Sequence, residues 1–242
     1  MGKKTILVII GMVIIAAYAM VEVSYYSYKN TEIVNVNTSS VQIPALDLDE
    51  NINNESVNLG VYHEPLSQDP LKGQVVLFGH RTSYGSPFLK LNELKKGDNV
   101  TIKWPGIGEI HYTVTKSYVV DASYRLDATK DKQMVYLITC HPVGSNDQRL
   151  IVEADYVSSN NITVNTNDNG VFNPMPIVYI LIFAIACVLL SYFYPVKEDR
   201  IYLAIASAIL IIILILSYFM PSITAPVASA LDSINTVFNI KI

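Results

Sequence analysis

Three side chains that together could attack an amide bond stand at the ends of apolar segments. Cys140 ends one such segment, His80 ends another, and Arg149 begins a third. A thiolate is a strong nucleophile, an imidazole can take up and return its proton, and a guanidinium can stabilise the oxyanion formed on the attacked carbonyl. Taken singly, each has an ordinary explanation as a buried thiol, a solvated histidine or a surface ion-pair partner. Taken together, they indicate thiol-based acyl transfer.

Strand alternation indicates where these side chains point, because successive residues of a strand face opposite sides. Arg149 alternates with residues that should face a core, namely Leu150, Val152, Ala154 and Tyr156. We therefore expect Arg149 on the outer face. Cys140 and His141 are adjacent and should point in opposite directions, which makes His80 the better partner for the thiol unless a turn at Pro142 changes the geometry. A turn of eight residues would bring the ends at Cys140 and Arg149 side by side.

The elements that must position these groups are short apolar runs in the middle of the chain. Gly, Pro and Asn separate the runs, a pattern typical of all-β domains that form an antiparallel barrel or sandwich. Residues 86–94 are predicted to form one or two helical turns with Pro87 at the first position. The expected strands comprise residues 41–43, 57–61, 74–78, 99–103, 109–118, 134–139 and 149–157.

Three long apolar runs flank this region. Only 16% of the 242 residues are charged, against about 25% in an average soluble domain. Each run approaches the roughly 20 residues that a helix needs to cross a membrane. The predicted organisation is an anchor (1–22), a stalk (23–40), a β domain (41–158), a linker (159–175), two further spans with a short loop (176–220) and a tail (221–242).

Basic residues predict the orientation of these spans, since positive charge stays on the cytoplasmic side. Lys3 and Lys4 precede the first run, and Lys197 and Arg200 lie between the second and third. The β domain is therefore expected outside the cell, on a multi-pass membrane protein. Ala-Tyr-Ala at residues 17–19 leaves open a cleaved signal peptide instead of an anchor. The net charge of −4 gives no reason to expect nucleic acid as a partner.

The order of the motifs resembles the sortase family over about residues 41–157. Residues 76–81 look like the Gly-His-Arg segment of that family, and residues 137–140 look like its Leu-x-Thr-Cys signature. Residues 149–152 resemble the strand that supplies the arginine of the family. The Lys-Gly-Asp turn at 96–98 and the opening strand at 41–44 are similar as well.

This resemblance implies a closed eight-stranded barrel with short helices, and a cysteine transpeptidase. Such an enzyme cuts a sorting motif near the C-terminus of an exported protein and holds the acyl fragment as a thioester on Cys140. It then passes the fragment to an amine, either a cell-wall peptide or a lysine of another protein. By the same resemblance His80 is the acid and base, Arg149 binds substrate and stabilises the oxyanion, and Thr139 contacts substrate. No metal or cofactor is expected, and two spans after the barrel are unusual for the family.

Two other functions fit the same residues. A membrane-bound cysteine endopeptidase would form the same thioester and release it to water, so only the acceptor distinguishes the two enzymes. A non-catalytic assembly module could use the barrel for binding alone, although the presence of His80, Cys140 and Arg149 together argues against it. A papain-like protease is disfavoured because His80 precedes Cys140 and the papain signature around the nucleophile is missing.

Overall fold

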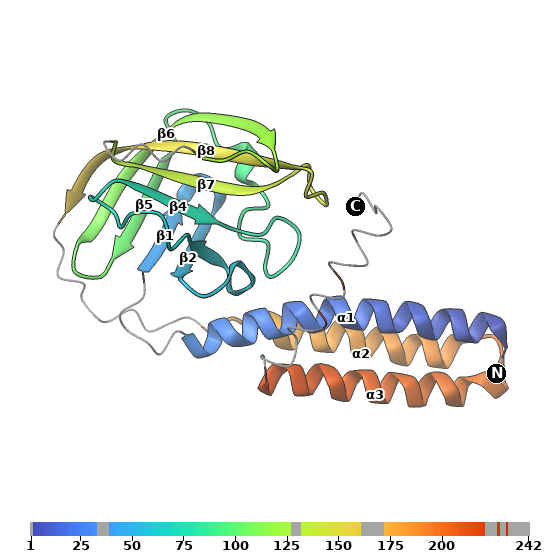
Figure 1. Ribbon diagram of the computed structural model, residues 1–242. Helices are drawn as coiled ribbons and strands as arrows, with labels where there is room; N and C mark the ends of the chain where they lie inside the picture. Colours follow the sequence, from blue (N-terminus) through green and yellow to red (C-terminus); the bar gives the residue numbers. More distant parts are fainter. Residues whose placement is uncertain are drawn as a thin grey trace. The chain divides into compact units, whose positions relative to one another are not determined.

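The computed structural model describes residues 2–32, 39–126, 132–160 and 172–220, together with residues 227 and 231. The chain divides into two compact units (Figure 1). The middle of the chain forms a β unit, and the two ends of the chain contribute three long helices to the other. Much of the predicted tail (221–242), and parts of the predicted stalk (33–38) and linker (161–171), lie outside the described residues.

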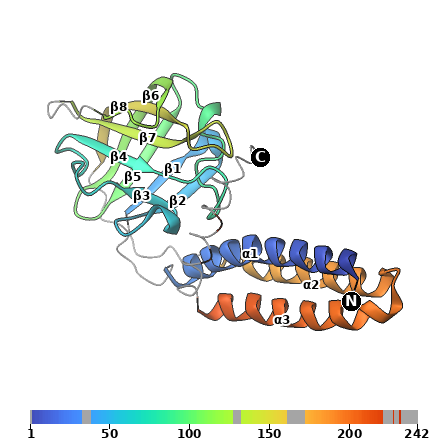
Figure 2. The same cartoon turned by 45° about the vertical axis from the view of Figure 1, so that its right-hand side comes forward.

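The β unit is a closed barrel of eight strands, as predicted (Figure 1 and Figure 2). The strands are β1 (Ser39–Ile43), β2 (Leu48–Asn53), β3 (Val61–His63), β4 (Gln74–Phe78), β5 (Asn99–Trp104), β6 (Gly108–Asp121), β7 (Met134–His141) and β8 (Gln148–Asn160). Their order around the barrel is β1-β2-β3-β4-β7-β8-β6-β5. Six neighbouring pairs are antiparallel, but β2 with β3 and β4 with β7 are parallel, so the expectation of a purely antiparallel barrel is wrong. Parallel neighbours require a crossover, which for β4 and β7 runs through β5 and β6.

Two of the predicted local elements differ from the structure. The strand expected at 57–61 is a 3-10 helix, Val57–Leu59, with the Ser56 hydroxyl accepting from the backbone of Asn58; β3 begins only at Val61. Within 86–94 the helical part is a single 3-10 turn, Leu91–Glu93. Residues 87–90 form a turn after Ser86, whose backbone is left-handed with φ of 48°, so no helix begins at Pro87.

Apolar residues of β4 and β7 are buried on both faces of the sheet. Val75, Leu77 and Leu137 belong to the barrel interior, whereas Val76 and Ile138 belong to a second cluster on the outer face. Parallel strands covered on both faces are typically continuous apolar runs rather than alternating ones. This explains why β4 and most of β7 contain so few polar residues before the sequence reaches His80 and Cys140.

The helical unit contains α1 (Lys3–Glu32), α2 (Met175–Phe193) and α3 (Arg200–Phe219), each in contact with the other two. The segments Lys3–Asn30, Met175–Phe193 and Lys197–Phe219 are long and apolar enough to cross a membrane. The predicted stalk is wrong over residues 23–32, because α1 continues through them. Its polar side chains have partners there: Ser24 Oγ donates to the carbonyl oxygen of Ser217 at 3.3 Å.

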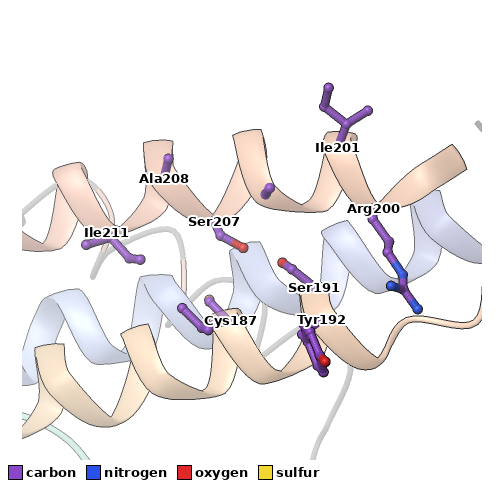
Figure 3. Close-up of a pocket in the computed structure, with 10 residues that line it drawn as sticks. Cys187, Ser191, Tyr192, Arg200, Ile201, Ser207, Ala208 and Ile211 are labelled. Atoms are coloured by element: carbon purple, nitrogen blue, oxygen red, sulfur yellow. The ribbon is translucent and has the colours of Figure 1, made fainter. Parts of the chain in front are cut away.

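Further polar contacts join the first turn of α1 to the start of α3. The Asp199 carboxylate accepts from the backbone nitrogen of Gly2 at 3.0 Å and from Thr5 Oγ1 at 2.5 Å. Thr5 Oγ1 also lies 2.9 Å from the Tyr194 hydroxyl. A groove of about 570 Å³ runs between α2 and α3, lined mostly by apolar and small polar side chains, with Arg200 at one end (Figure 3). The helical unit is therefore one packed bundle of all three helices.

Candidate active site

Three neighbouring strands bring the predicted site residues to one end of the barrel. β7 lies between β4 and β8, and Cys140 is paired directly with Arg149 across the antiparallel ladder. Residues opposite each other in such a ladder have Cβ atoms roughly 4.5–5.5 Å apart. On the other side Phe78 is paired with Ile138, so His80 and Cys140 each lie two residues beyond a paired position. The backbone of β4 stays beside β7 past that pair, because Gly79 donates to the Ile138 carbonyl at 3.2 Å.

The alternation of the strands gives Cys140 and Arg149 the same face. Tyr136, Ile138 and Ile151 belong to the outer cluster. Cys140 lies two residues after Ile138 in β7, and Arg149 lies two residues before Ile151 in β8, so both share the face of that cluster. Cys140 is half-buried and has no disulfide partner. The thiol and the guanidinium therefore lie on the outer side of the barrel. The alternation in the sequence predicted this face for Arg149, but it left the face of Cys140 open.

His80 is held by two residues that the sequence did not single out. Its Nε2 lies 2.8 Å from Oδ1 of Asn58, and its ring stacks on Tyr84 with centroids 4.9 Å apart and planes 26° apart. An amide oxygen only accepts, so Nε2 carries the proton and Nδ1 is left as the basic nitrogen. Asn58 lies in the 3-10 helix and Tyr84 in a loop with a φ of 52°, and neither position has a periodic pattern that would mark it.

The protonation state of His80 follows from its surroundings. Burial disfavours the imidazolium cation and lowers the pKa of His80 to about 4. The ring is therefore neutral at physiological pH, with a lone pair on Nδ1. A neutral imidazole can accept a proton from a thiol, which is the first step that thiol-based acyl transfer requires.

Arg149 is oriented by the connection between β7 and β8. Its Nη1 donates to the carbonyl oxygens of Asn146 at 2.8 Å and Gln148 at 2.9 Å. Within the described ranges these are the hydrogen bonds of its guanidinium, and they leave the N–H groups of Nη2 and Nε for a bound anion. Such N–H groups are the donors that a developing oxyanion would need.

Thr139 serves a structural purpose in this arrangement. Its side chain is 2% exposed, and Oγ1 donates to the carbonyl oxygen of Gly79 at 2.7 Å, which ties β7 to the end of β4. This bond favours a structural role for the hydroxyl over the predicted contact with substrate. Gly79 is needed for close approach, since a Cβ there would lie 2.6 Å from the ring of Phe88. Among the described residues, no three His, Cys, Asp or Glu side chains cluster as metal ligands.

Comparisons with known proteins give a family match and a set of similar folds. A family model described as the sortase domain matches residues 21–157, more than half of the chain. Sortase C-1 from Actinomyces oris is 29% identical, with 50% of this chain and 73% of that chain covered and a TM-score of 0.45. Sortase C1 from Streptococcus agalactiae is 27% identical, with 52% and 69% covered and a TM-score of 0.47. No curated protein matches. The family model thus spans all three strand ends described above.

Proposed function

Because the chain belongs to the sortase family, whose members are cysteine transpeptidases, we propose that it is a transpeptidase with Cys140 as its nucleophile. His80 is the acid and base of the proposed reaction, and Arg149 stabilises the oxyanion. The observation that carries this proposal is the convergence of three neighbouring strand ends. Cys140 is paired with Arg149, and His80 lies two residues beyond Phe78, as Cys140 lies two residues beyond its partner Ile138.

The first half of the proposed reaction forms a thioester. Nδ1 of neutral His80 takes the proton from the Cys140 thiol, and the sulfur attacks the carbonyl carbon of the scissile amide. The negative charge that develops on the carbonyl oxygen is stabilised by the Arg149 guanidinium. The intermediate then collapses with cleavage of the C–N bond, and the imidazolium of His80 gives its proton to the leaving amine.

The second half transfers the acyl group. An acceptor amine attacks the thioester carbonyl and loses a proton to His80, the C–S bond breaks, and Cys140 leaves as a thiolate that His80 reprotonates. The donor in this proposal is an exported protein with a sorting motif near its C-terminus. The acceptor is an amine of a cell-wall peptide or a lysine of another protein. Water in place of the amine would give the endopeptidase reaction.

The acceptor decides between transfer and hydrolysis. Surface proteins are compared between cells that contain this chain and cells that lack it. Only the cells that contain it should have a surface protein that is cleaved near its C-terminus and joined through the new terminal carbonyl to an amine. Added hydroxylamine should compete for the thioester and release that protein with a C-terminal hydroxamate, as measured by mass spectrometry. A free C-terminal carboxylate without hydroxylamine, and no product bonded to a cellular amine, would identify a hydrolase instead.

We also propose that the chain spans the membrane three times and keeps α1 after export, with the barrel outside the cell. Support comes from the packing of α1 against both other helices. At the start of α1, Gly2 and Thr5 also donate hydrogen bonds to the Asp199 carboxylate. Cleavage after Ala19 would remove those partners and leave the Asp199 carboxylate without them. Such a loss is unfavourable because Asp199 is only 5% exposed, and a buried carboxylate without hydrogen-bond donors carries an uncompensated desolvation cost.

The retained helix and the orientation are tested together. The intact mass of the chain purified from membranes should include residues 2–32. In a background with both cysteines replaced, Glu198→Cys should react with a membrane-impermeant maleimide only after the cells are permeabilised, whereas Ser158→Cys should react in intact cells. A mature chain that begins near residue 20, or the reverse labelling pattern, would contradict this topology.

A further inference from the structure

The arginine that follows His80 is buried against the end of β7. Arg81 is 4% exposed, and all three of its guanidinium nitrogens have acceptors. Nη1 donates to the carbonyl oxygen of Cys140 at 3.2 Å and lies 3.1 Å from Nδ1 of His141. Nη2 donates to Oδ1 of Asn92 at 2.5 Å, and Nε donates to the carbonyl oxygen of Leu89 at 3.3 Å. One side chain therefore joins the nucleophile's backbone to the loop between β4 and β5.

Neutral groups, rather than a carboxylate, surround this cation. In the described part of the chain no Asp or Glu forms a salt bridge with Arg81. A buried cation without an acidic partner carries a desolvation penalty that hydrogen bonds to neutral acceptors offset only in part. Burial accordingly lowers the pKa of Arg81, while the nearby Cys140 thiol raises it. The guanidinium also donates to the carbonyl oxygen of Cys140, so its positive charge lies against the backbone of the nucleophile.

The bond to His141 fixes the position of that residue's proton. A guanidinium has only donors and stays charged in proteins, so Nδ1 of His141 must accept. The proton of the neutral ring then lies on Nε2. A proton on Nδ1 would face the N–H group of Arg81 and add a second positive charge beside the first. His141 is therefore unable to take a proton through the nitrogen that faces Arg81.

We propose that Arg81 is a positioning residue for the nucleophile, which fixes the backbone of Cys140 and holds the His141 ring with Nδ1 as a hydrogen-bond acceptor and a proton on Nε2. The inference rests on the proposed function and deepens it, because it explains why one of two histidines near Cys140 is available for proton transfer. Strand alternation supports the division. Cys140 takes the outer face of β7 with Tyr136 and Ile138, whereas His141, the next residue of the strand, takes the opposite face and meets Arg81 there.

Tautomer state and thiol reactivity test this inference in the full chain in detergent micelles. The chain has four histidines, so the ring nitrogens of His141 can be assigned in a ¹⁵N-histidine spectrum by comparison with His141→Ala. In the parent at pH 7.5 we expect an unprotonated Nδ1 and a protonated Nε2 for His141. In Arg81→Met this preference should be lost. An Nδ1 of His141 that carries the proton in the parent would overturn the inference.

The second measurement is the alkylation of Cys140 by iodoacetamide at pH 7.5, in a Cys187→Ala background. Loss of the cation that is bonded to the Cys140 backbone should lower the rate constant of Arg81→Met by about three- to tenfold. Arg81→Lys keeps the charge but not the planar fork, so its rate should lie between those of Arg81→Met and the parent. Lys90→Met is the matched control, since Lys90 is an exposed cation of the same loop, and it should react like the parent.

Fluorescence of the single tryptophan, Trp104 in β5, shows whether each variant folds. If Arg81→Met does not fold, the parent spectrum and Arg81→Lys still decide the question. An alkylation rate of folded Arg81→Met within twofold of the parent would reject the positioning role. These readouts need no substrate, so a chain that makes no transfer product would refute the proposed function without changing the result for Arg81.

Discussion

Replacement of Cys140 by Ala should abolish transfer product and covalent acyl adduct while the barrel stays folded. The proposed reaction forms a bond to the Cys140 sulfur, and Cys187, the second thiol, is buried among the packed helices and is 3% exposed. Cys140 is half-buried at a strand end, so the loss of its sulfur should leave little cavity. Mass spectrometry of the surface-protein product measures the first effect, and the intact mass of the enzyme measures the second.

Cys187→Ala is the matched control for this experiment, because it removes the chain's second thiol and leaves the barrel unchanged. It should retain product and adduct near the levels of the parent. Turnover of Cys140→Ala close to that of the parent would exclude this nucleophile. Loss of turnover together with an altered Trp104 melting curve would show an unfolded barrel, in which case Cys140→Ser, with a hydroxyl of similar size, repeats the test.

The parts of the barrel with strong local patterns could be predicted from the sequence. The bounds of β4 agree with the prediction to the residue, and β7 and β8 were found with their site residues at the correct ends. These strands are apolar runs with turn residues on either side. β2 was missed because Leu48–Asn53 contains only two apolar residues among four polar ones. It forms because β1 and β3 supply partners on both of its edges.

The pairing of the strands was not predictable from the same patterns. Parallel contact between β4 and β7 joins segments that are 60 residues apart, as Phe78 and Ile138 show. Local alternation indicates which face a residue takes, and this is why the outward direction of Arg149 was inferred correctly. It carries no information about which strand lies next to which. His80 was preferred as the partner of Cys140 because it ends an apolar segment and His141 should point away from the thiol, and the resemblance to a family supported the same choice.

The residues that support the site were the hardest to predict. Asn58, Tyr84 and Arg81 all lie outside the strands, and their contacts depend on how the loops fold over the barrel end. The helical continuation of α1 was missed for a related reason. The polar side chains of residues 23–32 indicate a solvated stalk until the partners from the other end of the chain, such as Ser217, are known.

His80→Asn should lower kcat by roughly 10²- to 10⁴-fold, the usual contribution of a general acid and base. Neutral His80 takes the thiol proton and later returns it to the leaving amine, and the Asn amide can do neither. His111→Ala is the control, since His111 lies in β6 and bonds to Thr101 instead of facing the strand ends. A loss at His141→Ala as large as that at His80→Asn would reverse the assignment of the two histidines.

The same substitution tests whether the His80 ring is neutral in the fold. Its pKa is about 4 in the folded chain against about 6.5 when unfolded, so between these values the unfolded chain binds more protons. The parent barrel should therefore lose stability as the pH falls from 6.5 to 4, by up to about 3 kcal/mol more than His80→Asn. Trp104 fluorescence measures both melting curves. Parallel pH dependence in the two proteins would mean that His80 is not held neutral by burial, and the proton acceptor of the proposed first step would then be protonated at mildly acidic pH.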